Sequence, residues 1–410
     1  MSLPSPLINR PRAQQVLERS KVAALVLSDP TNIYYATGFW PQTVAMGQFG
    51  VAFAVVPADA SQPVTLITSQ FLHYLWDIHQ TPAGSPLQVF MYTAPDGLEG
   101  DAMPPMFLPP PPQGTADPLD ALSRAETLGA LDRQPAFPDV ISALRGALAG
   151  YEGLGIGVDS FIAPSHLGDA FAFQPADPML RMTRMVKTPA EVALMRHAAT
   201  NNAQAARVAI QSMKPGMTYL DLRHAFFAET GRRGGVPLFI STDSMAMRER
   251  DGVIQAGRSF QIDAVSSYAG YHGDYGRTVF VGEPDPVIRW MVDAAVCAND
   301  AIARELRPGL RFSDVTRIGL AAVKAGGYDV GIPCVAHSVG LFHSDEAFRD
   351  GSLNFRKDDH VIEENMVLSV DCPILHLDAT GNVHLEDLWL VTADGCEALN
   401  ERDAPFIQIG

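Results

Sequence analysis

Residues 261–278, QIDAVSSYAGYHGDYGRT, constrain the fold more than any other segment of this chain. Asp263 lies in an apolar run, and Asp274 follows a turn of small residues. If residues 261–265 and 273–281 pair as antiparallel strands around residues 268–270, both carboxylates lie on one face of the hairpin. Directly paired side chains have Cβ atoms about 4.5–5.5 Å apart, and diagonal ones about 7–8 Å. Carboxylates at such distances repel each other, and a cation or a shared proton would relieve the repulsion. Many Asp pairs are solvated, however, so this segment alone leaves metal binding open.

Three further candidate ligands lie beside apolar, strand-like runs: His337 in CVAHSVGLFH, Asp371 in MVLSVDCP and Glu386 in VHLEDLWLVT. Each has an ordinary explanation by itself, as a core histidine, a strand-ending aspartate or an exposed charge. Together with the hairpin they make four carboxylates and one imidazole near buried sheet. Such a set of mostly oxygen ligands suits Mn²⁺, Fe²⁺, Co²⁺ or Zn²⁺ in a two-metal site.

The chain divides into two regions of different texture. Residues 1–177 alternate a polar helix pattern, RAQQVLERSK, with short buried runs such as VAALVLS, VAFAVVP and VTLITS, which predicts an α/β domain. Residues 92–118 are rich in Pro, Gly and Asp and predict an exposed loop, with a lid or a partner-binding arm as the alternative. Thr188, Pro189 and Glu191 are the start signals of a helix that KPGM ends. We expect domains at 1–177 and 178–410.

Composition excludes some partners. The formal net charge of −16 argues against nucleic acid or an anionic membrane surface, because both require basic patches. The four cysteines show no CxxC spacing, which indicates a reducing interior. The first residues carry no apolar signal segment, and every apolar run is shorter than the roughly 20 residues of a membrane span. We therefore expect a cytoplasmic, soluble protein.

Several motifs, in order, resemble the "pita-bread" metallopeptidase family M24, which includes methionine aminopeptidase, aminopeptidase P, prolidase and creatinase. ALVLSDPTNIYYATGF is similar to the N-x-x-Y-x-T-G-F segment, and RMVKTPAEVALMRHAA to the R-x-x-K-x-x-x-E-x-x-x-M-R helix. The two hairpin aspartates, followed by GRT, the HSVGL element, NMVLSVDCP and HLEDLWLVT complete the pattern. The resemblance is closest to the prolidase and creatinase branch. It implies an α/β (α+β) fold with an N-terminal creatinase-like domain and a C-terminal catalytic domain, whose curved antiparallel sheet is flanked by helices.

The resemblance also implies a dinuclear centre of two divalent ions: Mn, Zn, Co or Fe. Asp263 would chelate one ion, Asp274 and Glu386 would bridge both, and His337 and Asp371 would complete the other. Such a pair lowers the pKa of a bridging water, which then attacks an amide bond. The implied protein is a metallohydrolase of the Xaa-Pro dipeptidase or aminopeptidase type. It would act on a short peptide or a small molecule and form a homodimer.

The sequence departs from the family pattern at four places. The fourth ligand, which also shuttles a proton, is Asp371 where the family has Glu. The family's substrate-side histidine has no counterpart in STDSMAMRERDGVIQAG, where Arg248 and Arg250 stand instead. The Arg of the R-x-E-D element is His384, which strand alternation places on the face of Glu386, either near the metals and substrate or as packing. His343 follows the ligand histidine by six residues where the family has seven.

We accordingly predict that Asp371 and His343 are catalytic, and that His343, His384 and Arg248 bind the substrate. A non-peptidase enzyme of this fold is the alternative, either a creatinase-like C–N hydrolase or a lyase on a small metabolite. Five ligand-competent residues argue against the metal-free creatinase chemistry. The lyase stays open, because the same ions would stabilise an enolate. A binding module that lost catalysis would show broken ligands and a charged tail, and this chain shows neither.

Overall fold

The computed structural model describes residues 7–75, 87–93, 117–243, 252–348, 358–375, 381–402 and 404–410. These residues form two compact units, one up to Thr183 and the other from Arg184 onward. The division falls at the end of helix α8 (Asp177–Arg184), whereas the predicted domain boundary coincides with the start of that helix. Most of the proline-rich segment, and both Arg248 and Arg250, lie outside the described residues.

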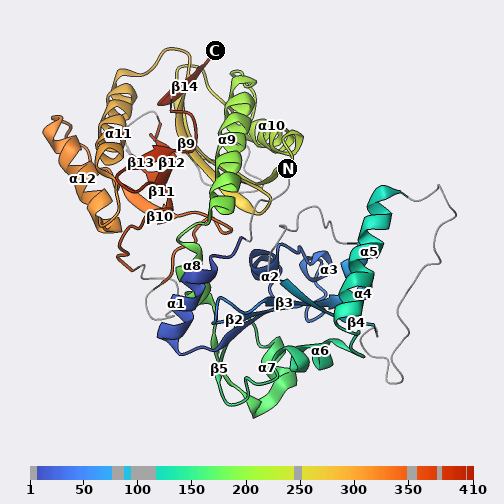
Figure 1. The fold of residues 1–410 in the computed structure, drawn as a ribbon. Coiled ribbons are helices and arrows are strands. Elements are labelled where there is room, and N and C mark those ends of the chain that lie inside the picture. Colours follow the sequence, from blue (N-terminus) through green and yellow to red (C-terminus); the bar gives the residue numbers. More distant parts are fainter. Residues whose placement is uncertain are drawn as a thin grey trace. The chain divides into compact units, whose positions relative to one another are not determined.

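The N-terminal unit contains one six-stranded mixed sheet with the strand order β4-β3-β2-β1-β5-β6. The apolar runs predicted as strands form β1, β2 and β3, which are buried along nearly their whole length. In Figure 1, α2 and α3 lie on one side of this sheet and α6 and α7 on the other. The strands are β1 (Ala24–Leu27), β2 (Phe53–Pro57), β3 (Val64–Ser69), β4 (Leu87–Tyr92), β5 (Gly155–Val158) and β6 (Ala172–Pro175). The helices are α1 (Arg10–Ser20), α2 (Pro30–Thr37), α3 (Gln42–Ala45), α4 (Gln70–Tyr74), α5 (Pro118–Arg133), α6 (Val140–Ala147), α7 (Ile162–Leu167) and the 3₁₀ turn η2 (Gly168–Ala170).

The C-terminal unit is built on a second sheet with the order β10-β11-β12-β9-β8-β7, in which all neighbours are antiparallel; β13 pairs with β12, and β14 runs parallel to β9. Its strands are β7 (Val236–Thr242), β8 (Ser259–Tyr268), β9 (Tyr271–Val281), β10 (Val335–Ser338), β11 (Val367–Asp371), β12 (Glu386–Val391), β13 (Cys396–Ala398) and β14 (Phe406–Ile409). Its helices are α9 (Pro189–Gln211), α10 (Tyr219–Arg232), α11 (Pro286–Glu305) and α12 (Phe312–Ala325).

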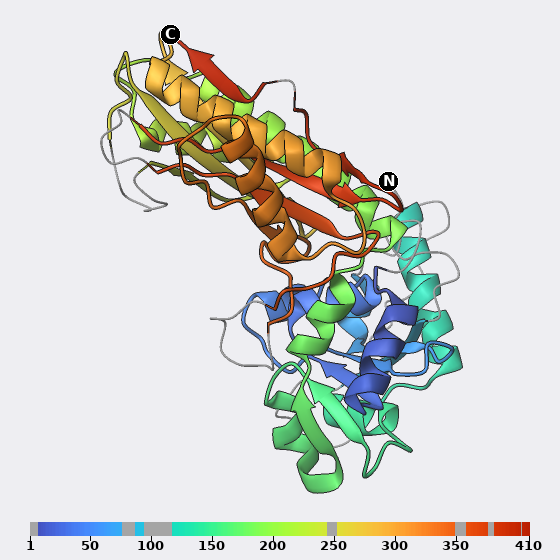
Figure 2. The same ribbon diagram turned by 90° about the vertical axis from the view of Figure 1, so that its left-hand side faces the viewer.

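Two helix pairs enclose this sheet. Helices α9 and α10 share a hydrophobic core with β7, β8, β9 and β14, while α11 and α12 pack near β10 and β13. Figures 1 and 2 show the curved strands between the two pairs. The predicted class, an α/β protein whose second part is a curved antiparallel sheet flanked by helices, is confirmed. None of the helices in the described part of the chain has the length and apolarity that a membrane crossing needs.

The start of α9 follows the sequence signals. The Thr188 hydroxyl accepts a hydrogen bond from the backbone N–H of Glu191, and the Glu191 carboxylate accepts one from the N–H of Thr188, which makes a capping box with Pro189 at the first helical position. The capping prediction is confirmed.

The hairpin of β8 and β9 is longer than predicted and turns at Ala269 and Gly270, which both have positive φ. A two-residue turn with this backbone matches the twist of paired strands. In the resulting register Asp263 lies opposite Gly276, and Asp274 lies opposite Val265. The two carboxylates are therefore diagonal neighbours on one face, as predicted.

Helix α9 approaches the backbone of this hairpin very closely. A Cβ at Gly273 would lie 2.5 Å from Cβ of Asn202 and 2.6 Å from the carbonyl oxygen of Ala198. The buried Asn202 amide donates to the carbonyl of Ala264 and accepts from the hydroxyl of Ser266, each at 2.7 Å. These contacts hold the helix against the strand that carries Asp263.

Gly273→Ala should lower the free energy of unfolding by about 1–3 kcal/mol, because the new methyl group forces the helix away from the hairpin. Gly231→Ala is the matched control: the site in α10 has open space, and alanine should be neutral or stabilising by up to about 1 kcal/mol. Urea midpoints followed by circular dichroism measure both. Equal midpoints for the two variants would contradict the close approach.

Candidate metal centre

Five polar side chains from adjacent strands meet on one face of the C-terminal sheet. The strand register arranges them in rows. Asp371 lies opposite Glu386, while Glu386 and Asp263 both lie opposite Gly276, on its two sides. Gly276 has no side chain, so the three carboxylates of this row face a common space. Asp274 lies two residues before Gly276 on β9. His337 lies on β10, two residues after Val335, which pairs with Asp371.

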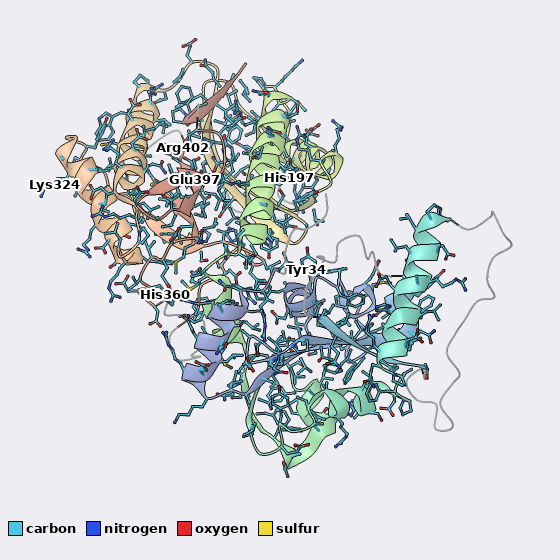
Figure 3. All side chains as sticks on the ribbon, viewed as in Figure 1. Tyr34, His197, Lys324, His360, Glu397 and Arg402 are labelled. Carbon is cyan, nitrogen blue, oxygen red and sulfur yellow. The ribbon has the colours of Figure 1, made fainter. Side chains whose placement is uncertain are left out.

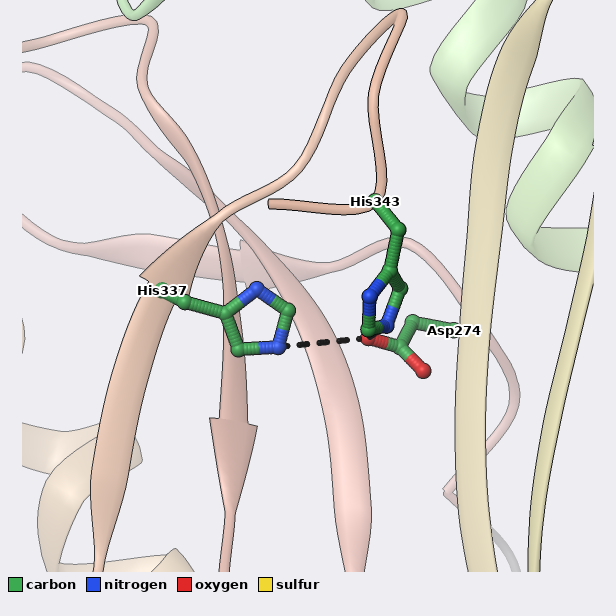
Figure 4. Close-up of side chains that lie close together, drawn as sticks. All are labelled: Asp274, His337 and His343. Carbon is green, nitrogen blue, oxygen red and sulfur yellow. Dashed lines mark hydrogen bonds and ion pairs between the residues drawn. The ribbon is translucent and has the colours of Figure 1, made fainter. Parts of the chain in front are cut away.

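The imidazole of His337 is surrounded by carboxylates. Its Nε2 atom lies 3.4 Å from Oδ2 of Asp274, 3.5 Å from Oδ2 of Asp371 and 3.7 Å from Oε1 of Glu386. A second imidazole, that of His343, places Nε2 3.0 Å from the same Oδ2 atom of Asp274. Figure 4 shows both rings directed at the Asp274 carboxylate.

Burial and mutual repulsion oppose ionisation in part of the cluster. Burial, with the charge of Asp274 added to it, raises the pKa of Asp263 to about 7. Burial also raises the pKa of Glu386 well above its usual range, and the charges of Asp274 and Asp371 raise it further. Desolvation and the neighbouring negative charges thus both favour the neutral form of these two carboxyl groups.

The other two carboxylates stay ionised because histidines donate to them. Burial by itself raises the pKa of Asp274, but hydrogen bonds from His337 and His343 outweigh it, and the net pKa is lowered. The pKa of Asp371 falls well below its usual range for the same reason, with His337 and His384 as the donors. In this state, imidazole protons neutralise the charge that a bound cation would otherwise balance.

The residues fit a divalent metal ion. Three buried oxygens accept no hydrogen bond within the described residues: Oδ1 of Asp263, Oδ1 of Asp274 and Oε2 of Glu386. Burying a polar oxygen without a partner costs free energy, which a bound cation would offset. Ligands about 2.1 Å from one ion lie about 3.0 Å apart at a right angle and about 3.4 Å apart in a tetrahedron. The nitrogen–oxygen distances around His337 are close to these separations.

A buried guanidinium holds the strand that carries Glu386. Among the residues that the structure describes, strand β12 pairs with β9 at one position, Glu386 opposite Gly276. Arg277 bridges this narrow junction: its Nη1 atom donates to the carbonyls of Gly276 and Glu386, each at 2.8 Å. Its Nη2 atom donates to Asp387 at 2.7 Å, and both side chains are 1% exposed. The ligand position thus depends on an ion pair between the residues that follow Gly276 and Glu386 in the chain.

A second buried ion pair fixes the loop that follows His337 and contains His343. The Nε atom of Arg184 lies 2.8 Å from Oδ1 of Asp345, and neither side chain is more than 1% exposed. The backbone N–H of Asp345 donates to the carbonyl of Ser338, and the N–H of Ser338 donates to the carboxylate of Glu346. Because Ser338 follows His337 directly, this network sets where the His337 strand ends.

His384 and Ser369 complete the surroundings of the centre. The His384 ring contacts Asp371 and Glu386, which is the first of the two alternatives left open by the sequence, and its substrate role stays a prediction. The hydroxyl of buried Ser369 donates to Oε1 of Glu386 at 2.8 Å. Sequence reasoning missed Ser369, although strand alternation from Asp371 places it on the same face.

The curved antiparallel sheet, with carboxylates and histidines gathered on one face, defines a protein of the pita-bread class. A profile of metallopeptidase family M24 matches residues 193–393, and one of the creatinase/prolidase N-terminal domain matches residues 10–75. The chain belongs to metallopeptidase family M24, and this family membership supports a hydrolase.

Relatives and solved structures agree with this assignment. The Xaa-Pro dipeptidase of Pyrococcus furiosus is 23% identical over 252 residues, which cover 57% of this chain and 68% of the relative. The methionine aminopeptidase of Aquifex aeolicus is 24% identical over 227 residues, covering 50% and 88%. The structure of the prolidase from Pyrococcus furiosus has a TM-score of 0.65 at 18% identity, over 95% of this chain and 100% of that one. The X-Pro aminopeptidase from Thermotoga maritima also gives 0.65, at 16% identity over 98% and 99%. At these identities the solved structures establish the shared fold.

Asp345→Asn should destabilise the protein by about 3–5 kcal/mol, because it removes the charge that faces the buried guanidinium of Arg184. Asp293→Asn is the matched control, since its partner Arg289 is on the same exposed face of α11 and such pairs contribute about 0.5 kcal/mol or less. Chemical denaturation of the full chain measures both. A loss at Asp345 as small as that at Asp293 would show that the buried pair does not hold the loop.

Proposed function

We propose that this protein is a metal-dependent hydrolase of the Xaa-Pro peptidase type, which cleaves a peptide bond with a metal-activated water. The observation that carries the proposal is the convergence of four carboxylates and one histidine. Three of the carboxylates each have a buried oxygen without a hydrogen-bond donor in the described residues. The named activity of its relatives, Xaa-Pro dipeptidases among them, supports the choice of substrate.

Two divalent ions would be held by Asp263, Asp274, His337, Asp371 and Glu386. When bound, they lower the pKa of a coordinated water to near neutrality and polarise the carbonyl under attack. The resident ion is one of Mn²⁺, Fe²⁺, Co²⁺ or Zn²⁺, because the donor set combines several carboxylate oxygens with imidazole nitrogen. The choice among these ions, the cytoplasmic location and the homodimer stay predictions from the sequence.

Asp371 is the proposed proton carrier. Its side chain is 26% exposed, whereas those of Asp274 and Glu386 are at most 2% exposed. It can therefore meet a water molecule and a substrate from the open side. In the proposed reaction the Asp371 carboxylate accepts a proton from the attacking water and delivers it to the departing nitrogen as the C–N bond breaks.

His343 is the proposed contact to the substrate. Its side chain is 33% exposed, whereas those of His337 and His384 are 7% and 5% exposed, and its ring makes a T-shaped contact with Phe239. Its Nε2 atom is anchored 3.0 Å from Asp274. Burial opposes protonation of His343, but the hydrogen bond and the charge of Asp274 outweigh it and raise its pKa. With Nε2 directed at Asp274, the ring atom that faces a substrate oxygen in this proposal is Nδ1. The predicted role of Arg248 concerns a residue outside the described ones.

Gently purified protein should contain close to two transition-metal ions per chain by elemental analysis. It should hydrolyse Xaa-Pro dipeptides, lose this activity on chelation and recover it with Mn²⁺ or Zn²⁺. The reason is that the ions supply both the nucleophile and the electrophilic assistance. A dipeptide and amide panel, assayed before and after stripping, provides the measurement.

Two other outcomes would overturn this function. Protein without metal, whose activity chelators leave untouched, would indicate creatinase-like chemistry carried by the histidines. Metal-loaded protein that cleaves no peptide or amide but eliminates from a small metabolite would indicate a lyase.

Asp263→Ala and Glu386→Ala should each lower metal affinity by more than about 100-fold, since even residues that only support a ligand contribute 10–100-fold. Peptide hydrolysis should be lost with the metal. Glu305→Ala, at an exposed position of α11, is the control and should retain both. Dialysis against buffered metal, followed by elemental analysis, measures retention. If both site variants keep the wild-type metal content, the ligand assignment is wrong.

A further inference from the structure

The ring of His384 is oriented toward the metal centre by its backbone contacts. Its Nδ1 atom lies 3.2 Å from the carbonyl oxygen of Ile262, which is the residue before Asp263. A carbonyl can only accept, so Nδ1 carries the hydrogen. The opposite ring nitrogen, Nε2, points away from Ile262 toward the carboxylates, and once it releases the hydrogen that it donates to Asp371 it offers a lone pair to a cation.

Those carboxylates stand at ligand-to-ligand distances from Nε2 of His384. Oδ1 of Asp371 is 3.0 Å away and Oε2 of Glu386 is 3.5 Å away. These values are close to the separations of about 3.0 and 3.4 Å expected for two ligands of one ion. The same Oε2 atom of Glu386 is one of the buried oxygens without a hydrogen bond in the described residues. Three ligand-competent atoms therefore face one space.

The ring has little freedom to leave this position. A Cβ on Gly276 would lie 2.6 Å from both Nδ1 and Cε1 of His384, so the ring lies directly against the strand backbone. The backbone N–H of His384 donates to the hydroxyl of Thr278 at 3.1 Å. The side chain is 5% exposed, which also separates it from bulk water. Such an imidazole is preorganised in the sense that binding a metal would require almost no rearrangement.

We propose that His384 is a further metal ligand, which binds through Nε2 and shares one divalent ion with Asp371 and Glu386. The inference rests on the proposed function, because it needs a metal at the centre. Metal-ligating histidines almost always donate their other ring N–H to a carboxylate, a backbone carbonyl or water. His384 has this arrangement, with Ile262 as the acceptor, whereas Nδ1 of His337 has no partner in the described part of the chain.

The proposal gives a physical reason for two of the departures from the family pattern. Aspartate at 371 and histidine at 384 contact each other directly. A histidine adds a neutral nitrogen ligand where an arginine would place a positive charge with no lone pair. Added imidazole shifts the preference of the centre from Mg²⁺ and Ca²⁺ toward Zn²⁺, Co²⁺ and Fe²⁺.

The test follows Co²⁺ binding to the metal-stripped full chain. Calorimetry gives the affinity, and proton NMR in H₂O shows the shifted, exchangeable ring N–H signals of histidines bound to the paramagnetic ion. His384→Ala and His384→Arg should each lose one such signal and weaken Co²⁺ binding by at least about 10–100-fold. His197→Ala is the matched control, because His197 is an exposed residue of α9 whose ring contacts that of Tyr268 (Figure 3), and this variant should keep the wild-type signals and affinity.

The variants separate the possible outcomes. Full affinity and an unchanged set of N–H signals in both would overturn the proposal and assign His384 to packing. Full affinity in His384→Arg with loss in His384→Ala would also overturn it, because positive charge and not a lone pair would then be required. If His384→Ala does not fold by circular dichroism, X-ray absorption of Co²⁺-loaded wild type and His384→Arg decides, since the arginine variant must show one imidazole fewer. Wild-type protein that takes up no Co²⁺ would instead refute the proposed function.

Discussion

Repulsion among buried carboxylates is the constraint on which the rest of the C-terminal unit depends. Strand pairing around Gly276 brings Asp371, Glu386 and Asp263 into one row, and Asp274 lies two residues before Gly276 on the same strand. In a medium of low dielectric such a group is stable only with added positive charge, from protons or from cations. Two of these carboxylates therefore have raised pKa values, and the other two are held ionised by histidines. A divalent metal ion resolves the same conflict more completely.

Two buried ion pairs beside this cluster hold the strands and the loop that carry its ligands. Arg277 joins β9 to β12 through two backbone carbonyls and Asp387, while Arg184 holds the loop after His337 through Asp345. Both pairs are almost fully buried, so removing one member would leave the charge of the other buried without a partner. Ligands held in this way are preorganised. Their mutual repulsion cannot push the strands apart, and a bound metal ion would relieve it.

Local features of this unit were predictable from the sequence. The α9 capping box depends on Thr188 and Glu191, three residues apart, and the alternation of the hairpin placed Asp263 and Asp274 on one face. The meeting of His337, Asp371 and Glu386 with the hairpin was expected only through the resemblance to a family, because more than sixty residues separate Asp274 from His337. The support from Ser369, the clamp of Arg277 and the acceptor for His384 were not predicted, since they depend on cross-strand register and on backbone atoms.

The sequence by itself determined which ligand-competent residues are present, that the two hairpin aspartates share one face, and where helix α9 starts, because each depends on residues near one another in the chain. Only the tertiary structure decided which carboxylates have raised pKa values and where an imidazole ring points. Those properties depend on distances of about 3 Å between atoms from different strands, and hydrogen bonding and electrostatics change steeply over such distances. His384 shows the difference: its place on the strand face was readable from alternation, whereas its contact with the carbonyl of Ile262 exists only in the folded sheet.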